Sequence, residues 1–212
     1  FPSVAMMKDY NDLDDMAVRV KLEGVKNVIV NNIGSLNIAL KYGFNVHGGI
    51  GLSVQSVRAA KEYIRLGIPD VMLSPELKLP AMKAIAELIP GRTGVAAYGK
   101  LPAMTVEKCV IRDVEMGKNA PGISSCAYCD TKPYSYITDR HGAKIPVRRT
   151  FKHRNVLYNS VPVYMADRLA TLTGGKVGDI HYYFTDETPN EASDIIDNYR
   201  NGDSPVGEVR RL

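Results

Sequence analysis

Hydrophobic and polar residues follow two alternating patterns over the first hundred positions of the chain. Short apolar, β-branched segments such as "VKNVIV" are typical of buried parallel strands, and the segments between them carry apolar residues at helical spacing. We expect strands at 3–7, 27–31, 45–49, 70–73, 93–98 and, later in the chain, 179–184. The helices between them are expected at 12–24, 34–43, 53–67 and 76–91. This alternation predicts βαβ units with right-handed crossovers and a parallel sheet.

The alternation breaks after Tyr98. No long helical pattern occurs from Leu101 to Asn159, and "YSYITDRHGAKIPVRR" predicts a β-hairpin around the turn "DRHG". The pattern then returns, with helices expected at 161–175 and 190–202 on either side of the last strand. We therefore divide the chain into three parts. They are βα units at 1–100, a cysteine-containing insertion with the hairpin at 101–160, and closing βα units at 161–212.

The predicted strands restrict the fold class to α/β without choosing one architecture. An open doubly wound sheet needs about five or six strands, whereas a closed (β/α)8 barrel needs eight. The hydrophobic pattern is compatible with a complete open sheet and with an incomplete, TIM-barrel-like (β/α)8 fold.

Composition adds few restrictions to this picture. The chain has 212 residues, 45% of them apolar, and a formal net charge of +4. This mild excess of basic residues does not by itself indicate a nucleic-acid partner. No apolar run reaches the roughly 18 residues of a membrane span, and the N-terminus lacks the pattern of a signal peptide, so we expect no membrane partner. Because the chain begins with Phe1, we interpret it as a piece of a longer protein.

The three cysteines are the most specific chemical signal. Cys109 lies upstream of a CxxC formed by Cys126 and Cys129, all within the insertion. Thiolates bind zinc or iron tightly, and a CxxC directs two sulfurs to one metal. His153, just after the hairpin, is the candidate fourth ligand, whereas His141 lies in the hairpin turn. Three ordinary buried thiols and a redox CxxC are the alternatives, and the odd number of cysteines favours a reducing cytoplasm.

Polar residues follow most of the predicted parallel strands, where α/β proteins carry their active sites. These residues are Asn31, Asn32, His47, Ser53, Gln55, Ser74, Glu76, Tyr98, Lys100, Asp186 and Glu187. Helix capping is the alternative role for some residues of this kind. Ser53 could cap the helix at 53–67, and Asp186 or the neighbouring Thr185 could cap the last helix. No Walker loop, GxGxxG, GxSxG or HExxH motif is present.

A basic segment, "KIPVRRTFKHR", closes the hairpin, and aromatic residues lie close to it in sequence. Its cations are Lys144, Arg148, Arg149, Lys152 and Arg154. Basic and aromatic residues together can hold phosphates and stack bases, so RNA is one possible partner. A solvated face of the hairpin is the alternative.

Several segments together resemble peptidase family U32, the collagenase-like proteases. They are "VIVNNIGSL", "GLSVQSVRAAKEYIRLGI", "VMLSPELKL", "AAYGKLPAMTVEKCVIR", "YSYITDRHGAKIPV", "VLYNSVPVYMADRL" and "FTDETPNEASDIIDNYRNG". The resemblance implies a (β/α)8-like barrel, here the C-terminal, partial-barrel region of a longer member. The family commonly has a fourth cysteine after the hairpin, where this chain offers only His153.

Three functions are compatible with this resemblance. The first is a peptidase that uses Glu76 and His47 as acid–base groups beside Lys100. The second is an iron–sulfur protein for oxygen-independent hydroxylation of RNA or ubiquinone precursors, because other members are similar to such proteins. The third is a non-catalytic, metal-stabilised domain that docks to the rest of its own chain or to RNA. A partial barrel could also pair with a second copy to cover its open strand edges.

Overall fold

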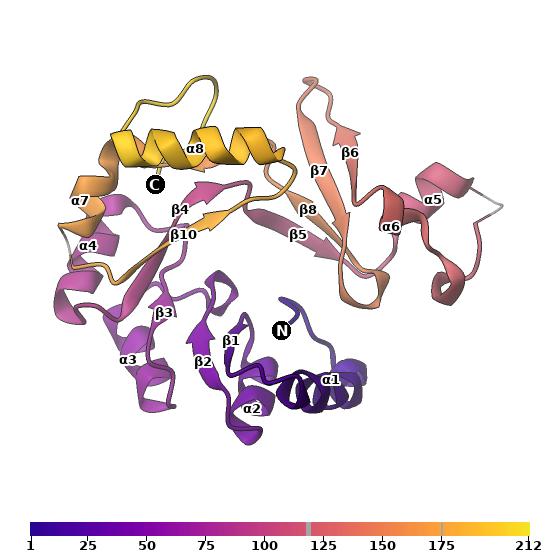
Figure 1. Ribbon diagram of the computed structural model, residues 1–212, viewed down its shortest axis with the longest axis horizontal. Helices are drawn as coiled ribbons and strands as arrows, with labels where there is room; N and C mark the ends of the chain where they lie inside the picture. Colours follow the sequence, from indigo (N-terminus) through magenta and orange to yellow (C-terminus); the bar gives the residue numbers. More distant parts are fainter. Residues whose placement is uncertain (118–119, 175) are drawn as a thin grey trace.

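The computed structural model describes residues 1–117, 120–174 and 176–212. They form a mixed α/β fold with two sheets, which Figure 1 shows side by side. The larger sheet has five parallel strands in the order β1-β2-β3-β4-β10. These strands are β1 (Asn27–Val30), β2 (Asn45–Gly48), β3 (Val71–Met72), β4 (Thr93–Gly99) and β10 (Asp179–Tyr183). A short strand, β9 (Val163–Tyr164), pairs antiparallel with β4.

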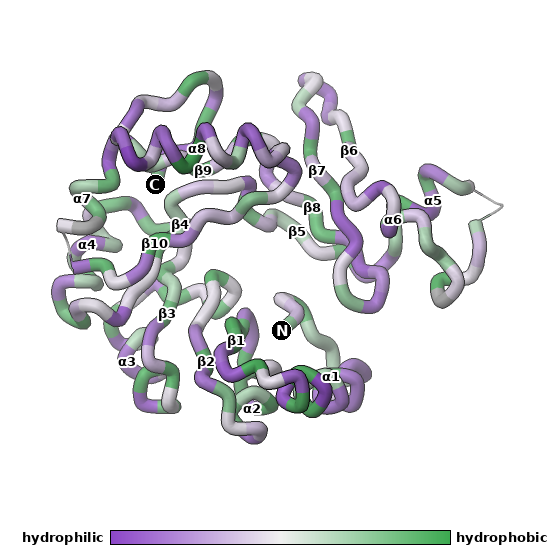
Figure 2. The backbone as a smooth tube through the Cα atoms, viewed as in Figure 1, coloured by the Kyte–Doolittle hydropathy of each residue, from purple (hydrophilic) through white to green (hydrophobic). Residues whose placement is uncertain are grey.

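Helices connect the parallel strands and pack on the larger sheet. They are α1 (Tyr10–Leu22), α2 (Ile33–Lys41), α3 (Val57–Arg65), α4 (Leu79–Leu88), α7 (Leu169–Thr173) and α8 (Pro189–Asn201). Hydrophilic and hydrophobic segments alternate along α8, as expected for a helix with one face on a protein core (Figure 2). Its buried Tyr199 donates a hydrogen bond to the Ala97 carbonyl at 2.6 Å, which fixes α8 against β4.

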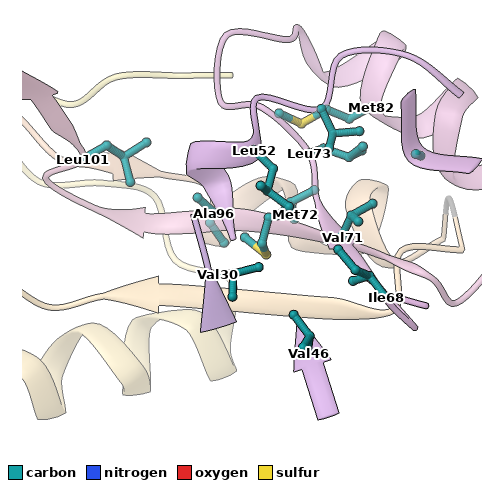
Figure 3. Close-up of a cluster of buried hydrophobic side chains, with 14 of the residues drawn as sticks. Val30, Val46, Leu52, Ile68, Val71, Met72, Leu73, Met82, Ala96 and Leu101 are labelled. Atoms are coloured by element: carbon teal, nitrogen blue, oxygen red, sulfur yellow. The ribbon is translucent and has the colours of Figure 1, made fainter. Parts of the chain in front are cut away.

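The main core lies between one face of the parallel sheet and these helices. Val30, Val46 and Val71 come from successive strands, and Met82 comes from α4; all four are buried (Figure 3). Burial of such side chains stabilises the fold by about 1.5–3 kcal/mol each. The alternate strand positions point to the other face, which is less covered: Ile29 is 45% exposed. This open face borders the site described below.

The insertion forms an antiparallel sheet in the order β5-β8-β7-β6. Its strands are β5 (Pro102–Val106), β6 (Tyr134–Thr138), β7 (Lys144–Arg149) and β8 (Asn155–Tyr158), and two short helices, α5 (Val110–Met116) and α6 (Tyr128–Thr131), precede β6. The predicted hairpin is confirmed as β6 and β7. Its turn is stabilised by Asp139 Oδ1, which accepts hydrogen bonds from the backbone N–H of His141 and of Ala143.

Four predictions of local structure were wrong. The last helix, α8, is capped by Thr188, which accepts the Glu191 N–H, rather than by Thr185 or Asp186. Residues 3–7 form no strand, and the turn Met7–Asp9 leads directly into α1. The expected helix at 161–175 begins instead with β9, and its last position lies outside the described residues. Ser56 rather than Ser53 caps α3, because Ser56 accepts the Ala59 N–H while Ser53 has a positive φ of 51°.

Candidate functional site

A cleft of about 970 Å³ lies at the carboxyl ends of the parallel strands. The loops after β1, β2, β3, β4 and β10 all contribute to its lining. These residues include Asn31, Ser53, Ser74, Glu76, Lys100 and Thr185. The antiparallel sheet supplies the opposite wall with Pro102, Arg148 and Tyr158. Residues of both sheets therefore line the cleft, as loops and insertions often line the active sites of α/β proteins.

Lys100 lies in this cleft at the end of β4, where the chain passes to the insertion. The preceding Gly99 has a φ of +129°, and a Cβ there would lie 2.2 Å from the Tyr183 carbonyl oxygen. Only glycine fits this approach of β4 to β10. The Lys100 ammonium lies 2.5 Å from Asp186 Oδ1, and both side chains are mostly buried. Gly99 thus directs Lys100 toward the loop that follows β10.

Asp186 connects the two sheets. Its second oxygen, Oδ2, accepts a hydrogen bond of 3.0 Å from the Tyr136 hydroxyl of the hairpin. Burial disfavours ionisation of Asp186, but the Lys100 ammonium and the Tyr136 and Thr185 hydroxyls outweigh it, so the pKa of Asp186 lies below its usual value. Burial and the adjacent Asp186 raise the pKa of Tyr136 to about 12. At neutral pH Asp186 is therefore a carboxylate and Tyr136 a neutral phenol.

A second, partly buried pair lies beside the first. The Tyr98 hydroxyl donates to Glu187 Oε1 at 2.9 Å, and Glu187 Oε2 accepts the Thr185 N–H at 2.5 Å. Burial and the Glu187 carboxylate raise the pKa of Tyr98 far above its usual value. Both acids that follow β10 are thus fixed in place by residues of β4 and its end.

Glu76 and His47 occupy different surroundings. Glu76 lines the same cleft as Lys100, is largely exposed and pairs with Arg210 at 3.2 Å. His47 faces Asp70, with 2.8 Å between Nδ1 and Oδ2, and it lines a neighbouring cavity of about 420 Å³ on the open face of the sheet. His181 of β10 lines both the cleft and this cavity. The structure thus groups Glu76 with Lys100 and places His47 in the neighbouring cavity.

Comparison of the sequence with models of known protein families identifies the family of this chain. The model of Peptidase family U32 matches residues 3–177, most of the chain. The chain belongs to peptidase family U32. No curated protein and no solved structure matches it.

The basic segment of this U32 chain is largely neutralised. Arg149 pairs with Asp130, Lys152 with Asp12 and Arg154 with Asp9. Arg154 is only 1% exposed, so this one residue departs from both interpretations of the segment, whereas Lys144, Arg148 and Lys152 are exposed, as expected for a solvated face. Within the described residues, only Lys144 and Arg148 of the segment have no carboxylate partner.

The three thiols lie in one region of the insertion. Cys109 and Cys129 are buried in a small core with Ile111 and Val147. Burial raises the pKa of Cys129; Arg149 opposes this, and the Cys109 and Cys126 thiols are close enough to add to it. No three His, Cys, Asp or Glu side chains among the described residues are close enough to hold one metal ion. The donor types suit zinc or iron, but a metal would require the thiols to come closer together than in this arrangement.

His153 lies on the same side of the insertion. Burial and the nearby Arg149 lower its pKa, and Asp130 opposes this. Arg149 is therefore close to both the Cys129 thiol and the His153 imidazole. The role of His153 as a ligand stays a prediction.

Several lining residues of the cleft were not anticipated from the sequence as site residues, among them Tyr158 and His181. Tyr158 follows an apolar strand and gave no chemical signal. His181 was hidden in the aromatic strand "DIHYYF", although strand alternation places it on the same face as Tyr183.

The helices of the described part of the chain were also compared with the length and hydropathy of a membrane span, and none of them meets both requirements.

Proposed function

We propose that this U32 chain binds a peptide in the cleft and that Glu76 and Lys100 hydrolyse one of its bonds. The observation that carries the proposal is their position: Glu76 follows β3, Lys100 follows the neighbouring β4, and both line one cleft. Family membership supports a peptidase, and the cleft is large enough for a segment of extended chain.

Each group has a defined role in this proposal. The Glu76 carboxylate accepts a proton from a water molecule while the water oxygen attacks the peptide carbonyl carbon. The Lys100 ammonium donates a hydrogen bond to the carbonyl oxygen and stabilises the negative charge that develops there. The proton held by Glu76 then passes to the leaving amine as the C–N bond breaks. Asp186 positions Lys100, and Tyr136 positions Asp186.

Cleavage of gelatin and of casein by the purified protein tests the proposal. We expect Glu76→Gln to lower the rate about 10²- to 10⁴-fold and Lys100→Met about 10²- to 10³-fold. Glu62→Gln is the matched control, because Glu62 is exposed on α3 and pairs only locally with Arg65. Unchanged cleavage by Glu76→Gln would remove Glu76 from the mechanism. The role of His47 is tested in parallel by His47→Gln.

We further propose that the parallel sheet is part of a (β/α)8-type barrel. Its strands are adjacent in chain order, without the reversal of a doubly wound sheet, and one face is covered by helices while the other lines cavities. In the described part of the chain β1 and β10 do not pair, so further strands would be needed to close the barrel.

A second candidate function is favoured by the thiols. Cys109 and Cys129 share one core, and Cys126 is close to Cys129, so a closure of this region would let the three bind an iron–sulfur cluster or zinc, with His153 as the fourth ligand. An iron–sulfur cluster would fit oxygen-independent hydroxylation of RNA or ubiquinone precursors. Iron, sulfide and zinc analysis of anaerobically purified protein tests this. We expect bound metal that Cys126→Ser and Cys129→Ser both remove; metal-free protein with three titratable thiols would contradict it.

A further inference from the structure

The charged side chains that line the cleft differ in whether they have an oppositely charged partner. Glu76 is paired with Arg210, and Lys100 is paired with Asp186. Arg148, on the wall formed by the insertion, has no carboxylate partner in the part of the chain that the structure describes. An unpaired arginine in a cleft keeps its donors free for a ligand.

Arg148 is nevertheless held in place. It lies opposite Tyr134 in the register of β6 and β7, its Nη1 donates to the Tyr134 hydroxyl at 3.5 Å, and its guanidinium lies 5.5 Å from the centre of the Tyr134 ring. Tyr158, at the end of β8, lies close enough to Arg148 for the guanidinium to oppose the rise that burial causes in the pKa of Tyr158. Two tyrosines therefore lie beside the guanidinium and restrict its positions, which reduces the entropy lost on ligand binding.

We infer that Arg148, with the Tyr134 and Tyr158 hydroxyls, binds a carboxylate of the peptide in the cleft. A guanidinium matches a carboxylate through two parallel hydrogen bonds. This inference rests on the proposed function, and it gives the substrate a class: peptides with a negatively charged group near the cleaved bond.

The surroundings favour a single carboxylate over a nucleic-acid backbone. Binding of a phosphate chain needs several free cations along a groove. Here Arg149, Lys152 and Arg154 are already paired with acids. The carboxylate could belong to the C-terminus of a peptide or to an Asp or Glu side chain, and the test separates these sources.

The test measures binding of fluorescent peptides to the full chain carrying Glu76→Gln, so that cleavage does not interfere. Four peptides are compared: a free C-terminal acid and its amide, and an internal Glu and its Gln counterpart. In at least one of the two pairs, we expect the charged peptide to bind at least 10-fold more tightly than its neutral counterpart. We expect Arg148→Gln to abolish that difference. Arg148→Lys should restore part of it. Arg65→Gln on α3 is the matched control and should change nothing.

The outcomes separate the inference from the proposed function. If the acidic peptide binds through Arg148 but the wild-type chain cleaves nothing, the inference holds and the peptidase proposal fails. If cleavage occurs and Arg148→Gln leaves KM and the acid–amide preference unchanged, the inference fails. Loss of oligo(U) binding rather than peptide binding in Arg148→Gln would also overturn it. A thermal melting curve equal to that of the wild type shows that each variant is folded.

Discussion

The two sheets are stabilised in different ways. The parallel sheet shares a continuous apolar core with its helices, which includes residues of β1, β2, β3 and β4. Among the described residues, the buried members of the small core of the insertion are only Cys109, Ile111, Cys129 and Val147. A sheet with so little apolar burial needs other interactions, because an isolated small sheet is marginally stable in water.

Buried polar residues supply part of those interactions. Arg154 Nη2 lies 2.7 Å from Asp9 Oδ2, and both side chains are 2% exposed, so this pair joins the insertion to the segment before α1. The next residue, Asn155, accepts the Ile111 N–H at 3.1 Å and lies 3.7 Å from Cys109 Sγ through its Nδ2. The insertion is therefore positioned by a buried ion pair and by polar contacts of Asn155, whereas the parallel sheet relies on apolar packing.

Among the changes predicted here, Arg154→Met should lower the free energy of unfolding the most. Removal of one member of a buried ion pair leaves the Asp9 carboxylate buried without its partner, so we expect a loss of about 3–5 kcal/mol in the free energy of unfolding. Lys41→Met, in the exposed pair with Asp14, is the control and should cost less than about 1 kcal/mol. Urea unfolding of both variants measures the difference. Equal effects would show that the buried pair does not hold the insertion.

Truncation of a buried apolar side chain should lower the free energy of unfolding more in the parallel sheet than in the insertion. Leu73 is fully buried in the main core, whereas Ile111 belongs to the small one. Leu→Ala and Ile→Ala substitutions cost about 2–5 kcal/mol, more where the surroundings cannot collapse into the cavity. We expect Leu73→Ala near the upper end of this range and Ile111→Ala near the lower end. A larger loss for Ile111→Ala would mean that the small core is as rigid as the main one.

The same difference explains which parts of the fold could be predicted from the sequence. The strands at 27–31, 45–49 and 93–98 were correct to within a residue because buried parallel strands have a continuous apolar pattern. "SVAMM" has the same local pattern, but no strand of the described chain pairs with it and Met7 is 91% exposed. A strand needs a partner, and the local pattern does not show whether one exists.

The site was predictable to a similar extent. Glu76, Lys100 and Asp186 could be placed from the rule that strand ends carry active sites. The contribution of the insertion could not, because Tyr136 reaches Asp186 across 50 residues of sequence. The basic segment misled for the same reason: the acids that neutralise it, such as Asp9 and Asp12, lie in the N-terminal part of the chain.

As the pH falls, the ion pair that attaches the insertion should lose its contribution to stability, whereas the apolar core has no titrating group to lose. Burial of Asp9 disfavours its ionisation, but the Met6 N–H and Arg154 outweigh this and hold the pKa of Asp9 below its usual value. A lowered folded-state pKa contributes stability that is present above about pH 4 and is lost as the pH falls further. We expect the free energies of unfolding of wild type and Asp9→Asn, measured in urea from pH 6 to pH 3, to converge at low pH. A constant difference between them would contradict this.

The smallest predicted effect lies in the parallel region, at the start of α8. Thr188 Oγ1 accepts the Glu191 N–H at 3.3 Å, Glu191 Oε2 accepts the Thr188 N–H at 2.7 Å, and Pro189 occupies the first turn. Loss of such a cap costs about 1 kcal/mol, so Thr188→Ala should lower the free energy of unfolding by that amount, and Thr188→Ser should retain most of it. Because Thr188 directly follows Glu187, the same variants also show whether the cap positions the acids of the cleft. A drop in peptide affinity for Thr188→Ala but not for Thr188→Ser would show that α8 holds Asp186 and Glu187 in place, whereas unchanged affinity would leave that role to Lys100, Tyr98 and Tyr136.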